Sequence, residues 1–558
     1  MKYYMLMLLG LFSFFVRAQE NYSTLTEKAS ALMEESKDNA GYRKAFDLYE
    51  EAFKLYPKDI DGEGLYNASL LASKLKNNNK AFEYLTSLSL IKGNGGNFPG
   101  WTYIIGKNSE TEYNNLLSDP RWKTLQQKVA GYKKTFYTEL KEKENEFYST
   151  RKNILKNVRS TEALYTEIKN FNPYQAKKER DYSISFKIND SAKTSFFIHL
   201  PQNYNPQKKY SLLFFLHGAV RNNTLIDYQF ADGNLDGWNR YYTKYADQND
   251  VILVFPRASK QYNWMLSDHG FFMIPDMLKQ IKKSINVDDN KVFISGHSNG
   301  ATGSFSYLMK QPTQFAGFYG FNAYPKVFTG GTFVNNIKNR SFINFSTDQD
   351  YYYPPNANND FTKLMNGIAA DYKEYRYNGF PHWFPQFNES EPAYQILFKD
   401  LAGRKRNPFP KEISWELDDD RNGNADWISH IKLDTLSKNI NEHKALNFKI
   451  NKWLAYDDHD SLKVKDVDKN AFDFPRKFGA MKAEYEHNVF RVEASNIKSF
   501  SINISPEAVD LKENVKVYVN GKLYFNEKVK YNREFMLKNF EDTKDRDQVW
   551  VNYIAIKI

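Results

Sequence analysis

A serine between two glycines, in the segment Gly296-His-Ser298-Asn-Gly300, is the pattern in this chain best suited to covalent chemistry. The apolar run Val292 to Ile294 before it predicts a buried strand, and the residues Phe305 to Met309 after it predict a helix. A sharp turn between a strand and a helix exposes a serine hydroxyl as a nucleophile, and flanking glycines avoid a clash where the two elements approach each other. We therefore expect Ser298 to be a nucleophile; the alternative is an ordinary tight turn that contains a serine.

A serine hydroxyl becomes a good nucleophile when a histidine takes its proton and a carboxylate orients that histidine. Among the histidines that follow Ser298, only His382 lies in the region of alternating strands and helices, on a loop after the last predicted strand there. Two carboxylates, Asp348 and Asp350, follow the predicted strand Phe342 to Phe345. We expect Asp350 to orient His382, because a proline lies four residues after it, a spacing typical of such acid loops; Asp348 is the alternative.

The oxyanion that forms during acyl transfer needs two preorganised N–H donors. We expect one from the backbone N–H of Asn299, directly after the nucleophile. The other is expected from the backbone N–H of Ala219, in the turn after the apolar run Tyr210 to Leu216. Trp383 and the tyrosines at positions 351 to 353 are expected to line the entrance. This chemistry implies no cofactor and no metal.

The elements that must position these residues are a series of apolar runs. Runs that end at Leu216, Pro256, Ile294 and Phe345 alternate with helical segments, which predicts a mostly parallel sheet flanked by helices. Two earlier segments at hairpin spacing, within residues 182–201, predict an antiparallel edge. We expect an α/β catalytic domain over residues 181–403.

This region resembles the α/β-hydrolase superfamily, and within it the polyhydroxybutyrate-depolymerase and feruloyl-esterase group of secreted esterases. The resemblance rests on Leu-His-Gly-Ala219, on the run from Val287 to Gly300, on Gln-Phe-Ala-Gly317 and on Pro-His-Trp-Phe-Pro385. The chain departs from that group in having no cysteine, in lacking a third glycine after Gly300, and in lacking a His-Gly pair in the acid loop. The resemblance implies an α/β-hydrolase fold and a serine hydrolase that cleaves carboxylic esters through an acyl-enzyme.

The N-terminal residues 1–18 have a basic start, an apolar core and a small residue at Ala18, which is typical of a secretory signal peptide. The apolar run is too short for a confident membrane span, and we expect no span in the mature protein. Export to the periplasm or the outside of the cell is therefore expected. The absence of cysteine excludes disulfides and thiolate metal sites.

Residues 19–130 show helical spacing of apolar residues, and two helix pairs that end near Pro57 and Gly93 resemble tetratricopeptide repeats. Such a region could dock a protein partner, although a helical cap on the enzyme is the simpler interpretation. Residues 131–180 are expected to be a helical connector. The net charge of +10 is spread along the chain without a nucleic-acid-binding motif, so no nucleic-acid partner is expected.

Residues 411–558 carry short strand patterns separated by turn signals, which predict a β-sandwich-like C-terminal domain. It resembles a β-domain appended to exported bacterial peptidases and esterases. Asp418 to Asp426 has the spacing of the first part of a calcium loop, but Ser429 stands where the bidentate glutamate belongs. Asn422-Gly423 also fits a hairpin turn between two strands, which is the interpretation that we favour.

The main hypothesis is therefore a secreted serine hydrolase that cleaves carboxylic esters on a small molecule or a polymer, with Ser298, His382 and Asp350 as its triad. A serine peptidase with the same triad is the first alternative. Esterases and peptidases share this fold and triad, and the pocket determines which bond is cleaved. A non-catalytic helical-repeat interaction protein is the second.

Overall fold

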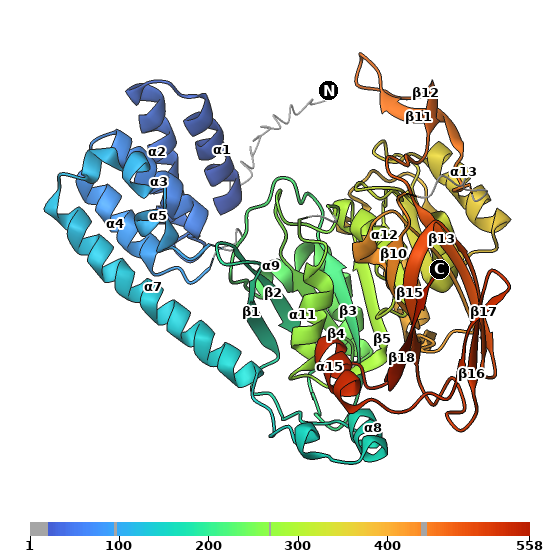
Figure 1. Ribbon diagram of the computed structural model, residues 1–558. Helices are drawn as coiled ribbons and strands as arrows, with labels where there is room; N and C mark the ends of the chain where they lie inside the picture. Colours follow the sequence, from blue (N-terminus) through green and yellow to red (C-terminus); the bar gives the residue numbers. More distant parts are fainter. Residues whose placement is uncertain (1–20, 94–97, 267–268, 437–443) are drawn as a thin grey trace, which may run out of the picture. The chain divides into compact units, whose positions relative to one another are not determined.

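The computed structural model describes residues 21–93, 98–266, 269–436 and 444–558, and it divides between Leu140 and Lys141 into two compact units. Figure 1 shows helices alone in the first unit, and sheets with helices in the second. The predicted signal peptide, residues 1–18, lies outside the described residues. Within the described ranges, no helix combines the length and the apolar character that a membrane crossing requires.

The first unit is built from helices, and side chains close the N-termini of the first four. Asn21, Asp38 and Asp61 each accept a hydrogen bond from a backbone N–H of the first turn that they precede. Helix α1 packs on α2 and α3 on α4, around an apolar core that includes Tyr49 and Phe53. The helices are α1 (Tyr22–Glu35), α2 (Asn39–Leu55), α3 (Gly62–Lys74), α4 (Asn78–Ser89), α5 (Thr102–Ile105), α6 (Ser109–Glu112), η1 (Asn114–Leu116) and α7 (Pro120–Phe147), whose residues from Lys141 onwards belong to the second unit.

The expectation of an all-helical N-terminal region is confirmed, and the likeness to tetratricopeptide repeats stays a prediction. Helix α7 runs without a break across residue 131, where we placed the start of the connector. The rest of the connector contains η2 (Leu155–Asn157) and α8 (Thr161–Lys169).

The second unit contains an eight-stranded sheet in the order β1-β2-β4-β3-β5-β6-β7-β8. Strands β1 and β2 form the expected antiparallel edge, and the strands from β4 to β8 run parallel, which confirms the predicted fold class. The strands are β1 (Asp181–Lys187), β2 (Lys193–His199), β3 (Tyr210–Leu216), β4 (Ile252–Pro256), β5 (Val287–Gly296), β6 (Gly317–Phe321), β7 (Ser341–Thr347) and β8 (Tyr372–Tyr377).

Helices cover both faces of this sheet because its strands are apolar on both sides. In β3, Leu212 and Phe214 face the core under α11, α12 and α13, whereas Leu213 and Phe215 face the core under α10 and α14. The helices are α9 (Asp232–Leu235), α10 (Arg240–Gln248), α11 (Met273–Lys282), α12 (Asn299–Lys310), α13 (Pro355–Gly367) and α14 (Glu391–Gly403), with short turns η3 (Gly237–Asn239), η4 (Val334–Asn339), η5 (Phe384–Gln386) and η6 (Asn388–Ser390).

The C-terminal residues form two further sheets, of order β17-β16-β14-β13-β9 and β10-β15-β18, which share one apolar core that includes Trp415 and Trp427. The β-rich C-terminal region is thereby confirmed. Its strands are β9 (Glu412–Leu417), β10 (Ile428–Leu433), β13 (Gly479–Glu486), β14 (Val489–Ser495), β15 (Ile497–Ile504), β16 (Val515–Val519), β17 (Lys522–Glu527) and β18 (Asn552–Lys557), with helix α15 (Arg533–Thr543). Strands β11 (Lys449–Tyr456) and β12 (Leu462–Asn470) form a separate hairpin.

The predicted hairpin at Asn422-Gly423 is wrong. Strand β9 pairs with β13, whereas β10 pairs with β15 in the other sheet, so the segment between them connects two layers. It forms a short 3₁₀ turn, η7 (Asp420–Asn422). Local turn residues are compatible with a hairpin, but the pairing partners come from much later in the chain.

The carboxylates at the two ends of this connector take part in buried ion pairs. Asp418 lies 3.1 Å from the Lys310 ammonium at the end of α12, and both side chains are 1% exposed. Asp426 lies 2.6 Å from the Arg340 guanidinium, just before β7, where the two are 1% and 5% exposed. Over the described ranges no group of three or more acidic or histidine side chains could hold a metal ion. These carboxylates thus join the C-terminal sheets to the α/β layer.

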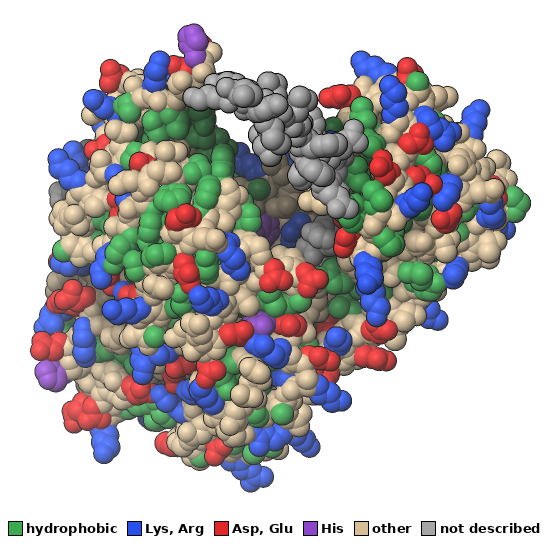
Figure 2. All heavy atoms as spheres, turned by 180° about the vertical axis from the view of Figure 1, so that it is seen from behind, with side chains coloured by type: hydrophobic (Ala, Val, Ile, Leu, Met, Phe, Trp, Pro, Cys, Tyr) green, Lys and Arg blue, Asp and Glu red, His purple; other side chains and the backbone are tan. Residues whose placement is uncertain are grey.

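Charged side chains elsewhere are mixed in sign. On the face seen in Figure 2, lysine and arginine are interspersed with aspartate and glutamate. On that face the excess of positive charge does not gather into one patch, which fits the sequence-based expectation.

Asp426→Asn should lower the free energy of unfolding by about 3–5 kcal/mol, because it leaves the Arg340 guanidinium buried without its counter-charge. Asp468→Asn is the matched control, since Asp468 pairs with Lys449 at an exposed site and should contribute under about 1 kcal/mol. Urea unfolding of the full chain, followed by tryptophan fluorescence, measures both. If both substitutions lowered the free energy of unfolding by the same small amount, Asp426 would not be the partner of a buried charge.

Candidate active site

Ser298 occupies a strained turn between β5 and α12. Its φ is +56° and its ψ is −121°, a combination that a side-chain-bearing residue adopts only when the surroundings enforce it. The Ser298 N–H donates to the carbonyl oxygen of Phe321 on the neighbouring strand, at 3.0 Å. A Cβ at Gly300 would lie 1.7 Å from the Leu216 carbonyl oxygen, so only glycine fits there. The local geometry is the one that the Gly-x-Ser-x-Gly pattern predicted.

His382 lies between Ser298 and Asp350. Its Nε2 is 2.8 Å from Ser298 Oγ, and its Nδ1 is 2.9 Å from Asp350 Oδ2. His382 is 7% exposed and Asp350 is 1% exposed, so the His–Asp contact is shielded from water. The structure brings together the three side chains that we named as nucleophile, base and orienting acid.

Of the two candidate acids, Asp350 is the one in contact with the histidine. Its Oδ1 accepts a hydrogen bond from the Tyr352 N–H at 2.9 Å. Asp348 instead accepts from the Gly379 N–H at 2.7 Å, which holds the start of the histidine loop. The two carboxylates therefore have separate partners.

Asn322 is a site residue that our reading of the sequence missed. Its side-chain amide donates to Asp350 Oδ2 at 3.0 Å and to Thr347 Oγ1 at 2.8 Å. It follows β6 directly, at the same sheet edge as the other site residues, and has a φ of +53°. In the sequence, Asn322 is marked only as an asparagine at the end of an apolar strand. Such a position is too common to identify a site residue.

His297, which precedes Ser298, holds the backbone of His382 in place. Its Nε2 donates to the His382 carbonyl oxygen at 2.8 Å, and the ring centroids lie 5.1 Å apart. Burial lowers the pKa of His297 to about 4, with a smaller contribution from His382. His297 therefore stays neutral near pH 7 and keeps its donor directed at the His382 backbone.

The two expected oxyanion donors are in suitable surroundings. Asn299 begins helix α12, so its N–H has no acceptor in its own helix. Ala219 lies in the turn after β3 with a φ of +52°. Among the hydrogen bonds of the described residues, neither amide serves as a donor.

His217 fixes the orientation of the Ala219 amide. Its Nε2 accepts from the Ala258 N–H at 3.1 Å, so its Nδ1 carries the proton and donates to the Gly218 carbonyl oxygen at 2.8 Å. That carbonyl and the Ala219 N–H belong to one planar trans peptide and point in opposite directions. Burial lowers the pKa of His217 to about 4, which keeps this tautomer neutral.

A cavity of about 780 Å³ opens above Ser298. Its aromatic lining includes Tyr352 and Trp383, as expected, but Tyr351 is not part of the lining. Arg221 is the single lysine, arginine, aspartate or glutamate among the lining residues of this cavity. Four aromatic side chains at its mouth are among the most exposed large apolar side chains of the described residues: Trp238 (44%), Phe328 (37%), Tyr352 (54%) and Trp383 (37%).

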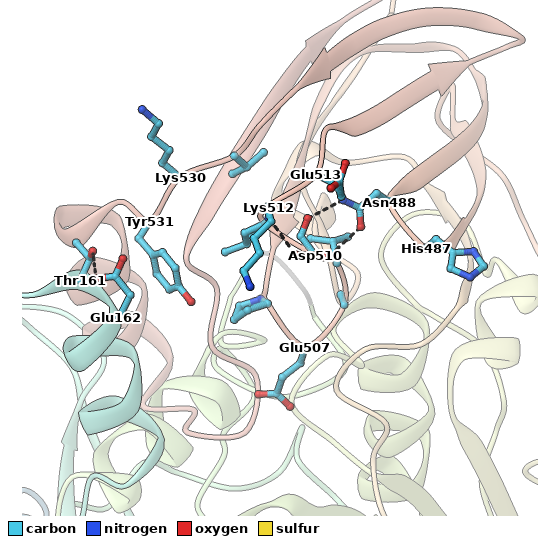
Figure 3. A pocket seen from close by; sticks show the side chains of 15 residues that line it. Thr161, Glu162, His487, Asn488, Glu507, Asp510, Lys512, Glu513, Lys530 and Tyr531 are labelled. Atoms are coloured by element: carbon cyan, nitrogen blue, oxygen red, sulfur yellow. Dashed lines mark hydrogen bonds between the residues drawn. The ribbon is translucent and has the colours of Figure 1, made fainter.

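A larger hollow of about 1120 Å³ lies on the C-terminal domain beside α8 (Figure 3). Its lining contains no serine–histidine pair, and Glu507 is already engaged by the Tyr165 hydroxyl and the Lys169 ammonium. Of these two hollows, the one above Ser298 has the side chains for covalent chemistry.

A family model described as "Putative esterase" matches residues 191–326, a segment that contains Ala219 and Ser298 and ends before Asp350. The sequence matches none of the curated proteins with which it was compared. Similar solved structures include a thermostable esterase (20% identity, TM-score 0.34), where the match covers 41% of this chain and 64% of that chain, under two thirds of its length. A ferulic acid esterase (16%, TM-score 0.31) is matched over 40% and 98%, and an S-formylglutathione hydrolase from Staphylococcus aureus (16%, TM-score 0.29) over 40% and 100%.

The buried His297 should make the fold sensitive to acid. Because its pKa falls from an ordinary 6.5 to about 4 on folding, the unfolded chain binds more protons between these values. Its contribution to stability is complete above about pH 6.5 and is lost as the pH falls towards 4. Between pH 7.5 and pH 5 this one group should cost about 2 kcal/mol of unfolding free energy.

His297→Gln, which keeps a side-chain donor, should reduce that loss, as measured by urea unfolding at both pH values. His487→Gln is the control, because His487 lies on the C-terminal domain at the rim of the other hollow. An unchanged pH dependence in His297→Gln would show that His297 is not the buried neutral group that we describe.

Proposed function

We propose that this protein, which has the α/β-hydrolase fold, is a carboxylic ester hydrolase that attacks its substrate with Ser298 and forms an acyl-enzyme. The observation that carries the proposal is the short relay in which His382 lies 2.8 Å from the serine oxygen and 2.9 Å from Asp350. This spacing is within the range for proton transfer from nucleophile to base.

In the first half of the reaction, Ser298 Oγ bonds to the ester carbonyl carbon while His382 Nε2 takes the hydroxyl proton. The carbonyl oxygen becomes an oxyanion that the N–H groups of Ala219 and Asn299 stabilise. The tetrahedral intermediate then collapses, the bond to the alcohol oxygen breaks, and His382 returns its proton to that oxygen. In the second half, water takes the place of the alcohol and releases the acid.

Asp350 accepts a hydrogen bond from the His382 Nδ1–H throughout and stabilises the imidazolium that forms transiently, without itself taking the proton. Its own hydrogen bonds to Asn322 and to the Tyr352 N–H keep the carboxylate in place. Because His297 stays neutral, it adds no positive charge beside His382 when that histidine takes the proton.

The cavity supports an ester with an apolar or ring-bearing group, because aromatic side chains dominate the lining. Arg221 gives the lining a positive charge, which disfavours cationic esters relative to neutral and acidic ones. We further propose that the protein is exported, on the basis of residues 1–18, and that the helical N-terminal region is available for a protein partner.

Ser298→Ala should lower kcat for a short p-nitrophenyl ester by on the order of 10⁴-fold or more, because the nucleophile is lost. Ser306→Ala is the control: this serine lies in helix α12, which follows Ser298, donates to the Thr302 carbonyl oxygen, and does not line the cavity. Its effect should stay below about tenfold.

A fluorophosphonate probe gives an independent readout, because it should label the native protein and the Ser306→Ala variant but not Ser298→Ala. A native protein that neither turns over the ester nor reacts with the probe would refute the serine hydrolase proposal and favour an interaction protein.

Asp350→Asn should lower kcat on the same ester by roughly 10⁴-fold, because an amide no longer fixes the required tautomer of His382. Asp348→Asn changes the neighbouring carboxylate in the same way and should have a much smaller effect, because its partner is the Gly379 N–H. Steady-state kinetics of both variants at saturating ester decides between them. A larger loss in Asp348→Asn would reassign the triad acid.

A further inference from the structure

Three polar side chains with unused donors line the cavity next to the proposed nucleophile. Arg221 and Asn222 lie in the turn after β3, which also supplies one proposed oxyanion donor, and Asn299 begins helix α12. This turn packs against the nucleophile, because a Cβ at Gly218 would lie only 3.1 Å from Ser298 Cβ. Within the described ranges, none of the three side chains has a hydrogen-bond or ion-pair partner, so all three can donate to a ligand.

The positive charge of Arg221 is not balanced by the cavity lining. Among the described lining residues there is no aspartate and no glutamate. The proposed triad carboxylate, Asp350, does not line the cavity and is 1% exposed. Its oxygens already accept hydrogen bonds from the Asn322 amide, the His382 ring and a backbone N–H. A ligand in this cavity therefore meets one positive side chain and no negative one among the described lining residues.

A second guanidinium without a carboxylate lies behind the same turn. Arg257 follows β4, and its Nη2 lies 3.5 Å from Asn223 Oδ1, while the Asn223 amide donates to the Ala219 carbonyl oxygen at 3.0 Å. The Nε of Arg257 is buried and has no hydrogen-bond partner in the described part of the chain. Burial lowers the pKa of Arg257, and no neighbouring carboxylate raises it. Arg257 therefore adds positive potential to the turn that carries Arg221.

We propose that Arg221, together with the side-chain amides of Asn222 and Asn299, binds a carboxylate carried by the ester that Ser298 cleaves. A guanidinium matches the two oxygens of a carboxylate with parallel N–H groups, and amide NH₂ groups donate to the same oxygens. One arginine in the lining suits a single negative charge, whereas a phosphate monoester carries up to about two. The substrate class is therefore the acid-bearing ester, such as a half-ester of a dicarboxylic acid. This inference rests on the proposed esterase function of Ser298.

The carboxylate and the reacting carbonyl group use different donors. Side chains hold the carboxylate, whereas the backbone N–H groups of Ala219 and Asn299 stay available for the oxyanion. Because the carboxylate is remote from the reacting carbon, its attraction to Arg221 is the same in the bound ester and in the transition state. Such uniform binding lowers KM and leaves kcat nearly unchanged. The preference for acid-bearing esters should therefore appear in KM.

The test compares monoethyl glutarate with diethyl glutarate, which differ by one negative charge at the end of a flexible chain. Arg221→Gln should lower kcat/KM for the monoethyl ester roughly three- to tenfold more than for the diethyl ester, chiefly through KM, because an ion pair at an exposed arginine is lost. Ethanol release gives the rates. Each ester also competes with p-nitrophenyl acetate, and its inhibition constant should show the same difference even where its own cleavage is slow.

Arg491→Gln is the matched control, because it removes the same charge from an exposed position on β14 of the C-terminal sheet. It should leave the ratio of the two kcat/KM values unchanged. Arg221→Lys should recover part of the preference, since the charge returns without the fork of N–H groups. Raising the salt concentration should narrow the difference between the two esters in the native enzyme.

Equal losses on both esters in Arg221→Gln would overturn the proposal, because Arg221 would then shape the cavity without binding the carboxylate. An equal change of the ratio in Arg491→Gln would overturn it as well, since the overall charge of the protein would be the cause. Turnover of p-nitrophenyl acetate by the native enzyme separates the two levels: its presence retains the esterase proposal even when the carboxylate site fails, and its absence removes both.

Discussion

The close approach of helix α12 to strand β3 is the constraint on which the rest of this structure depends. The Leu216 carbonyl oxygen occupies the space in which a side chain at Gly300 would stand. The helix can therefore begin directly above the strand, and the chain reaches it through a residue with a φ of +56°, Ser298. The same approach places the N–H at the start of α12 beside the turn after β3. The proposed nucleophile and the proposed oxyanion donors are thus positioned by one backbone contact.

Parallel strands supply the remaining groups. Strands β5, β6, β7 and β8 each end at the same sheet edge and are followed by Ser298, Asn322, Asp350 and His382. Each residue is held by hydrogen bonds that cross from one strand end to the next, such as the Asn322 amide on Asp350. Ligand sites at the carboxyl ends of a parallel sheet follow from this topology, because the loops there converge.

The sequence predicts those parts of the site that depend on local chain geometry. The glycines that flank Ser298 indicate a strained turn, and His382 stands out because it is the only histidine after Ser298 within the α/β region. Asn322 and His297 act through neighbours that come from other strands, so no local pattern marks them. The wrong prediction of a hairpin at Asn422-Gly423 has the same cause. The residues there are compatible with a hairpin turn, but the strands on either side pair with strands that come much later in the chain. In β11 and β12 lysines and aspartates lie on both faces, which obscures the alternation that marks a strand.

The C-terminal part of the chain contacts the α/β layer at two places. Buried pairs at Lys310–Asp418 and Arg340–Asp426 fix the far end of α12 and the entry to β7. The hairpin holds the acid loop through Trp453 and Tyr351. Helix α12 is therefore anchored at its start by the contact with β3 and at its end by an ion pair with the β-sandwich. The strained turn at Ser298 is thus followed by a helix whose two ends are both held, the first by backbone packing and the second by a buried charge pair.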